Sequence, residues 1–167
     1  GDPLEMLRDH WVGRYCAYAQ RAASMSPIDF HLSLALAAGA AAIARRVCLR
    51  WSALTIYPNL YVLIVAPSTL YHKTTALNVM RGVVKLAGLD EFLLPDMQTP
   101  ESLTMEMGLI KPPTYKEWGK SEQAQWQESR RFAGQRLWVL DEAGRLLDAF
   151  KRDHTAGLLS LLLALYD

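Results

Sequence analysis

The stretch Asn59-Leu-Tyr-Val-Leu-Ile-Val-Ala-Pro-Ser-Thr-Leu-Tyr-His-Lys-Thr-Thr-Ala-Leu77 decides the predicted fold. Residues 60–66 are apolar throughout, which is typical of a strand covered on both faces in a parallel sheet. A short loop follows, and residues 74–87 have the spacing of an amphipathic helix that ends at Gly88. The stretch therefore predicts a strand, a loop and a helix that opens with Lys-Thr-Thr.

This layout is that of a phosphate-binding P-loop, whose pattern is G-x-x-x-x-G-K-[ST]. Lys73 and Thr74 stand in their places, whereas Pro67 and His72 stand where the two glycines belong. Glycine lets the backbone approach a phosphate and adopt positive φ, and His72 brings a Cβ and a ring into that space. Two rescues are open: a loop one residue longer that starts at Ala66, or a protonated His72 that contacts phosphate. The alternative is a loop that no longer binds triphosphate, with His72 facing solvent.

A second motif, Leu137-Trp-Val-Leu-Asp141-Glu142, resembles a Walker B strand. The apolar run predicts a core strand over 136–141, which places two neighbouring acids at its carboxyl end, beside the strand that feeds the loop. Asp141 would hold Mg²⁺ or its water, and Glu142 would orient and deprotonate the attacking water. The 68 residues from Lys73 to Asp141 leave room for the helix, a further strand and helix, and a polar insertion.

Together the two motifs predict a site for ATP and Mg²⁺. The start of a helix supplies N–H groups and a favourable dipole for the phosphates. Lys73 would bind the β- and γ-phosphates, and the metal would be held by Thr74 and Asp141. The side chains expected around the phosphates are Ser68, Thr69, His72, Lys73, Thr74 and Thr75, and the expected catalytic pair is Lys73 and Glu142.

The rest of the chain predicts a helical lead-in over residues 1–46, followed by an α/β domain over 47–167. In the lead-in, Ser26-Pro27 separates two helices. Thr99 and Pro100 have the pattern of a helix cap and first residue. The remaining expected elements are helices over 3–24, 28–46, 99–110, 143–151 and 155–166, a short strand over 47–51, and a weak strand at 93–94.

Residues 111–135 form a polar, charged segment marked by two tryptophans, which predicts an insertion that is partly helical. One interpretation is a solvated excursion. The other is a contact surface for a partner or a nucleic acid, in which cations meet phosphates while the tryptophans stack on bases. The residues that would act in this way are Lys116, Lys120, Arg130 and Arg131, with Trp118 and Trp126.

Composition narrows these alternatives only slightly. The 167 residues suit about one domain, and the net charge of +1 by itself demands neither nucleic acid nor membrane. The apolar segment from Phe30 to Ala44 is too short to span a bilayer comfortably, so we expect a buried helix and no membrane association. Cys16 and Cys48 lack metal-type spacing, which favours thiols in a reducing compartment and thus a cytoplasmic location.

On these residues the chain resembles a P-loop family of bacteria, phages and mobile elements, a domain-of-unknown-function family related to replicative primase-helicases. The resemblance spans about residues 28–167. It lies in the Ala-rich helix, in Tyr57 to Ser68, in Lys73-Thr-Thr-Ala-Leu, in Thr99-Pro-Glu-Ser-Leu, in Leu140-Asp-Glu and in the Leu-rich tail. It implies a partial RecA-like P-loop NTPase core, a parallel sheet flanked by helices, after an α-helical N-terminal segment.

The resemblance also implies an ATPase module of a DNA replication, helicase-like or mobile-element protein, with DNA as a partner. Some members keep Gly-Lys where this chain has His72-Lys73. It further implies that the domain continues past Asp167, so a second copy or a partner chain would complete it. Two other readings stay open: a degenerate nucleotide-binding or scaffold domain without catalysis, and an unrelated α/β domain with Lys73 and Asp141 as ordinary surface groups.

Overall fold

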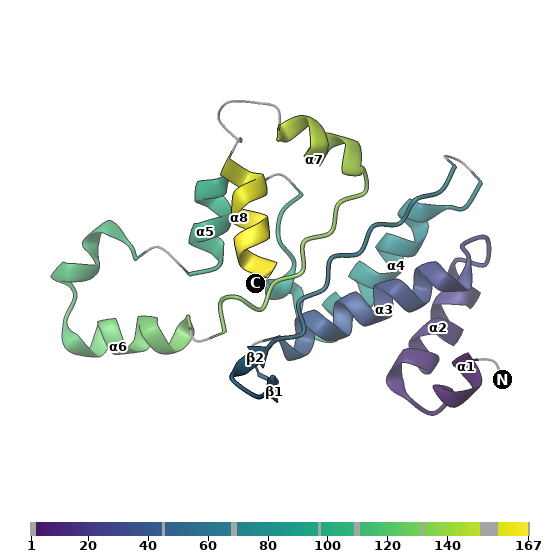
Figure 1. Cartoon of the computed structure of the whole chain (residues 1–167), viewed down its shortest axis with the longest axis horizontal. Helices are drawn as coiled ribbons and strands as arrows, with labels where there is room; N and C mark the ends of the chain where they lie inside the picture. Colours follow the sequence, from purple (N-terminus) through teal and green to yellow (C-terminus); the bar gives the residue numbers. More distant parts are fainter. Residues whose placement is uncertain are drawn as a thin grey trace. The chain divides into compact units, whose positions relative to one another are not determined.

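The structure, a computed structural model, describes residues 3–44, 46–67, 70–96, 98–108, 111–130, 132–150 and 157–166. The chain divides into two compact units. The first unit comprises Gly1–Ala42 and Leu60–Leu93, and the second comprises Ile43–Asn59 and Leu94–Asp167. Figure 1 traces their elements.

Helices that bury one apolar face each build the first unit. In α2 the buried residues Val12, Tyr15, Cys16 and Ala19 follow helical spacing. Helix α4 buries Ala76, Met80 and Val84, one turn apart, and packs against α2. The elements of this unit are α1 (Pro3–Met6), α2 (Trp11–Ala22), α3 (Ile28–Ile43, which reaches the second unit at its last residue), α4 (Lys73–Leu86) and the 3-10 helix η1 (Asp90–Phe92).

The lead-in is helical as predicted, but a single helix over 3–24 is wrong. Helix α1 ends at Met6 and α2 begins at Trp11. His10 caps α2, since its Nδ1 accepts the Val12 N–H at 3.4 Å. The chain between the helices folds back so closely that the Leu7 carbonyl occupies the space where a Cβ of residue 13 would lie. Gly13 permits this contact, and the helical spacing of the apolar residues does not reveal it.

Helix α4 follows the sequence prediction closely. It begins at Lys73 and ends at Leu86. Gly88 then has φ 71°, and the N–H of Leu89 donates to the Val84 carbonyl at 3.1 Å, as in a Schellman turn. The predicted stop at Gly88 is confirmed.

The second unit is built from short helices and one β-hairpin. A small apolar core contains Leu94, Leu103 of α5 and Leu158 of α8, with Trp138 and Phe150 among the side chains packed around it. The elements are β1 (Leu49–Trp51), β2 (Leu54–Ile56), α5 (Pro100–Glu106), the 3-10 helix η2 (Pro113–Glu117), α6 (Lys120–Ser129), α7 (Ala143–Ala149) and α8 (Gly157–Tyr166).

The start predicted for α5 is confirmed, whereas its end is not. The Thr99 hydroxyl accepts the Ser102 N–H at 3.2 Å, and Pro100 is the first helical residue. The helix ends at Glu106, before the predicted residue 110, and Gly108 has φ 67°. A glycine in this conformation closes a helix.

The predicted fold class, a parallel RecA-like sheet flanked by helices, is wrong. Across the described ranges the chain is mostly helical, and its sheet consists of the antiparallel pair β1–β2 alone. In that pair Leu49 lies opposite Ile56 and Trp51 lies opposite Leu54. Neither of the two predicted core strands, 60–66 and 136–141, forms a strand in a sheet.

The exposure of residues 60–65 explains why the strand prediction fails. A strand in a parallel sheet is covered on both faces and paired along its edges. Here Leu63 is 71 % exposed and Val65 is 80 % exposed. The second stretch makes one backbone contact of the expected kind, since the Leu94 N–H donates to the Leu137 carbonyl at 3.1 Å. These runs were predicted to be strands from their apolar composition alone. Such a composition does not show whether neighbouring strands are present to pair with them.

No helix in the described ranges is both long enough and apolar enough to cross a membrane. The Ala-rich helix α3 instead contributes Leu34, Ala35 and Ala41 to the core of the chain. The prediction of a buried helix there is confirmed.

One buried polar residue of the first unit is a histidine, and its charge state is coupled to folding. His31 of α3 has no exposed surface; its Nε2 lies 3.4 Å from the Ala23 carbonyl oxygen, and its Nδ1 has no hydrogen-bond partner. Burial lowers the pKa of His31, because it disfavours the charged ring, while the hydrogen bond to Ala23 acts in the opposite direction.

We therefore expect the protein to lose stability as the pH falls below about 6.5, the ordinary pKa of histidine. A folded-state pKa below the unfolded value means that the unfolded chain binds the proton more readily. The contribution is complete above the unfolded pKa and is lost as the pH falls toward the folded pKa. Urea unfolding at pH 7.5 and 5.5 would measure this loss, which His31→Gln should reduce. An equal loss in the variant would contradict the assignment to His31.

Candidate functional site

Helix α4 begins with an uncommon backbone conformation. The residue before it, His72, has φ 42° and ψ 46°, the left-handed helical region. A residue with a Cβ rarely adopts this conformation, whereas glycine adopts it freely. Position 72 is also where the P-loop pattern has its second glycine. The backbone at His72 thus takes the kind of conformation for which that pattern uses glycine.

Lys73 closes the loop that precedes the helix. Its side chain is half-buried, and its Nζ donates to the carbonyl oxygen of Ala66 at 2.9 Å. This bond joins the two ends of the loop, whose residues lie between Ala66 and Lys73. The contact holds the ammonium group at the start of α4, and the longer loop that starts at Ala66 stays a prediction.

The electrostatics of this helix start favour an anion. The first turn of any α-helix leaves its N–H groups without acceptors inside the helix, and the dipole is positive there. In most helices a capping side chain or an acidic residue interacts with these N–H groups. Here the His72 side chain makes no capping hydrogen bond, no acid lies in the first turn, and Lys73 adds a positive charge. A left-handed residue followed by right-handed ones also turns successive N–H groups toward a common concavity that binds anions.

The other predicted phosphate contacts are partly accounted for. His72, Thr74 and Thr75 are exposed at this end of α4. Ser68 and Thr69 lie outside the described residues. The structure therefore brings His72, Lys73, Thr74 and Thr75 together on one helix start.

The predicted acids lie in the second unit, just before α7. Asp141 and Glu142 are both exposed. Glu142 is the cap residue of α7, and its Oε2 lies 2.8 Å from Nε of Arg145, one turn along the helix. Such an exposed pair contributes at most about 1 kcal/mol, so the Glu142 carboxylate exchanges this partner at little cost. Lys73 belongs to the first unit, so the two halves of the predicted site lie in different units.

The predicted Mg²⁺ ligands lie in different units, Thr74 in the first and Asp141 in the second. Searching the part of the chain that the structure describes finds no group of three or more His, Cys, Asp or Glu placed to hold a metal ion. Mg²⁺ bound with a nucleotide uses phosphate oxygens, water and one or two protein oxygens. A threonine hydroxyl and an aspartate carboxylate are oxygen donors by residue type, and the Mg²⁺ site at Thr74 and Asp141 stays a prediction. When bound, the ion would neutralise phosphate charge.

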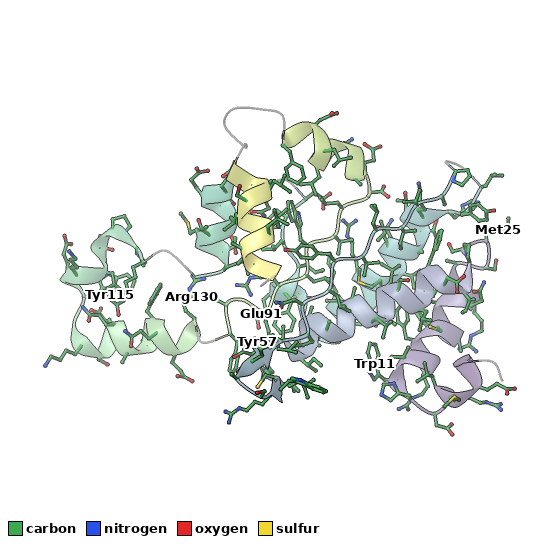
Figure 2. The ribbon with its side chains drawn as sticks, in the orientation of Figure 1. Trp11, Met25, Tyr57, Glu91, Tyr115 and Arg130 are labelled. Atoms are coloured by element: carbon green, nitrogen blue, oxygen red, sulfur yellow. The ribbon has the colours of Figure 1, made fainter. Side chains whose placement is uncertain are left out.

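The predicted insertion contains α6 and a small aromatic cluster. Tyr115 is buried, and its ring centroid lies 5.7 Å from that of Trp118 and 5.1 Å from that of Trp126. Gln127 donates to the Tyr115 hydroxyl at 2.9 Å. The guanidinium of Arg130 lies 6.0 Å from the Trp126 ring centre. Figure 2 labels Tyr115 and Arg130 of this segment. The two tryptophans thus form a local core with Tyr115, and their use as a nucleic-acid platform stays a prediction.

The sequence reasoning missed a residue that contacts the candidate site. Ser26 is fully buried, and its Oγ donates to the His72 carbonyl at 3.1 Å. The only signal was the Ser-Pro pair that separates two helices. A break of this kind predicts a turn but not the segment that the turn contacts.

Comparison with protein-family models, with curated proteins and with solved structures found no match. The family resemblance therefore stays a prediction from the motifs.

Proposed function

We propose that this protein binds ATP through the start of helix α4. The observation that carries the proposal is the combination at one helix start of Lys73, the left-handed His72 and the absence of an acid or a side-chain cap. Each of these features favours a bound anion, and a triphosphate is the anion for which the Lys-Thr pattern is used.

The charge distribution along the sequence supports an anionic ligand. No Asp or Glu occurs between Asp29 and Asp90, although the net charge of the whole chain is only +1. The same stretch contains six basic residues, namely Arg45, Arg46, Arg50, Lys73, Arg81 and Lys85. A segment with an excess of positive charge favours phosphate-bearing ligands. This excess of positive charge is consistent with ATP as a ligand and with DNA as a partner. We propose DNA because of the family resemblance.

The proposed reaction is hydrolysis of ATP with Mg²⁺ bound to the phosphates. Water attacks the γ-phosphorus and loses a proton to Glu142, while the bond to the ADP oxygen breaks; ADP and inorganic phosphate are released. Lys73 contributes positive charge toward the transferred phosphoryl group. The alternative is a protein that binds ATP without hydrolysing it and serves as a scaffold. The two glycines replaced by Pro67 and His72 favour this alternative.

A second copy or another chain is proposed as a partner of the exposed apolar segment. Leu60, Tyr61, Leu63 and Val65 are each at least half exposed. Contiguous apolar surface of this kind marks an interaction site in soluble proteins. We also propose a cytoplasmic location, in line with the two free thiols of Cys16 and Cys48.

Calorimetric titration with ATP and Mg²⁺ tests the binding proposal. We expect Lys73→Ala to weaken binding by roughly 10- to 100-fold, which corresponds to the loss of a charge-assisted hydrogen bond. Lys85→Ala is the matched control, because it removes the same charge from the last turn of the same helix. It should change the affinity by less than about 3-fold. Equal affinity in wild type and the Lys73 variant would refute the proposed site.

A further inference from the structure

The turn between α2 and α3 contacts the candidate phosphate site directly. Ser26 lies in this turn and is 1 % exposed, next to the exposed Met25 that Figure 2 labels. Its Oγ donates to the carbonyl oxygen of His72 at 3.1 Å. These residues are 46 positions apart in the sequence and lie within the first unit.

Several hydrogen bonds hold the turn itself in place. The Ser26 N–H donates to the Ala23 carbonyl at 3.0 Å. The Gln20 side chain donates to the carbonyls of Ser24 and Ser26 at 3.0 and 3.2 Å. The ring of His31 lies against the Ala23 carbonyl, with Nε2 at 3.4 Å. The Ser26 hydroxyl is therefore presented to His72 from a firmly anchored segment.

The His72 carbonyl is held from two sides. It accepts the Ser26 hydroxyl at 3.1 Å and the Ala76 N–H at 3.2 Å, so both of its lone pairs are used. The peptide unit is planar and trans, with the C=O and the next N–H on opposite sides. Fixing the His72 carbonyl thus also fixes the direction of the Lys73 N–H. A strained left-handed residue persists only where its surroundings hold it, and Ser26 supplies such a contact.

We infer that Ser26 is a positioning residue for the phosphate site, an inference that rests on the proposed function. Its hydroxyl holds His72 in the left-handed conformation and so aims the Lys73 N–H and the first turn of α4 at the phosphates. Glycine adopts the left-handed conformation freely because it has no Cβ. In this loop, which lacks the glycines of the pattern, the contact with Ser26 stabilises the same conformation at His72.

Ser26→Ala tests this inference, with Ser24→Ala as the matched control in the same turn. Ser24 is exposed, and its backbone carbonyl makes the contact to Gln20 that is retained in the variant. We expect Ser26→Ala to weaken ATP·Mg²⁺ binding by roughly 5- to 10-fold, the usual effect of one lost hydrogen bond, and Ser24→Ala to change it by less than about 2-fold. Ser26→Cys, with nearly the same size and a weaker donor, should lie between them.

A double substitution separates positioning from general destabilisation. In a His72→Gly background the left-handed conformation needs little support, so Ser26→Ala should then weaken binding by less than about 2-fold. A full-sized effect in that background would overturn the inference, as would equal binding by the wild type and Ser26→Ala.

Amide hydrogen exchange gives a readout without nucleotide. The Ala76 N–H bonds to the His72 carbonyl, so its exchange should become several-fold faster in Ser26→Ala than in Ser24→Ala. If the Ala76 amide exchanged at the same rate in both variants, the positioning role of Ser26 would be overturned, whatever the result of the nucleotide titrations. No ATP binding by the wild type, together with faster exchange in the alanine variant, would overturn the proposed function and leave the Ser26–His72 contact supported.

Discussion

Replacing Gly13 with alanine should destabilise the first unit by about 3 kcal/mol, at the upper end of overpacking effects. A Cβ at this position would overlap the carbonyl oxygen of Leu7 and would lie 2.7 Å from the Leu7 carbonyl carbon. Both atoms belong to the backbone, so they do not move aside by a change of rotamer. Since whole domains are stable by about 5–15 kcal/mol, the loss should be plain in urea unfolding followed by circular dichroism.

Gly82→Ala provides the matched control, because it is the same change within a helix. Apart from the nearby backbone of α4 itself, none of the described residues has an atom within 4 Å of a Cβ at position 82, which is in the interior of α4. Alanine has a higher helix propensity than glycine by about 1 kcal/mol, so this variant should be more stable than the wild type. Helix propensity favours alanine at both positions. If Gly13→Ala and Gly82→Ala were destabilised by a similar amount, the loss at position 13 would not come from its close packing, and the prediction would be contradicted.

The helices of this protein could be predicted because their signals are local. A cap such as Thr99, a stop such as Gly88 and apolar residues one turn apart each depend on a few neighbouring residues. The break before Trp11 was missed because it depends on the contact between Gly13 and the Leu7 carbonyl. That contact depends on the path of the backbone, which helical spacing does not report.

The sheet could not be predicted from the same kind of signal. A run such as 60–66 shows that a segment is apolar, but a strand also needs partners that lie elsewhere in the chain. The structure instead leaves Leu63 and Val65 mostly exposed and builds its sheet from a short hairpin. Burial and pairing depend on distant segments, so composition was not sufficient.

The start of α4 at the candidate site was predictable, but the contact that supports it was not. Lys73 stands at the start of a helix, as the pattern required. His72 adopts the left-handed conformation expected of glycine at this position, although a residue with a Cβ rarely adopts it. The reason lies partly in Ser26, whose hydroxyl contacts His72 from a turn far back in the sequence. A motif search examines neighbours in sequence and therefore does not find such a contact.

Glu142→Gln should leave ATP binding within about 3-fold of wild type and lower the rate of phosphate release by roughly 10²- to 10⁴-fold. The glutamine side chain keeps the size of glutamate but does not accept a proton from the attacking water. Glu142 is available for this role because its pair with Arg145 is exposed and weak. Acid-quenched single-turnover measurement of phosphate formation with ATP and Mg²⁺ would give the rate of the chemical step without interference from product release.

Asp148→Asn is the control for this experiment, because it makes the same chemical change at an exposed position of the same helix. It should leave the rate within about 3-fold of wild type. Phosphate release by Glu142→Gln at the rate of the control would refute Glu142 as the base. ATP binding by the wild type without any phosphate release would instead favour the scaffold alternative, in which the conformation held at His72 serves binding alone. In the first outcome the wild type hydrolyses ATP, and in the second it does not. The wild-type rate of phosphate release therefore shows whether Glu142 is the wrong base or whether the protein has no ATPase activity.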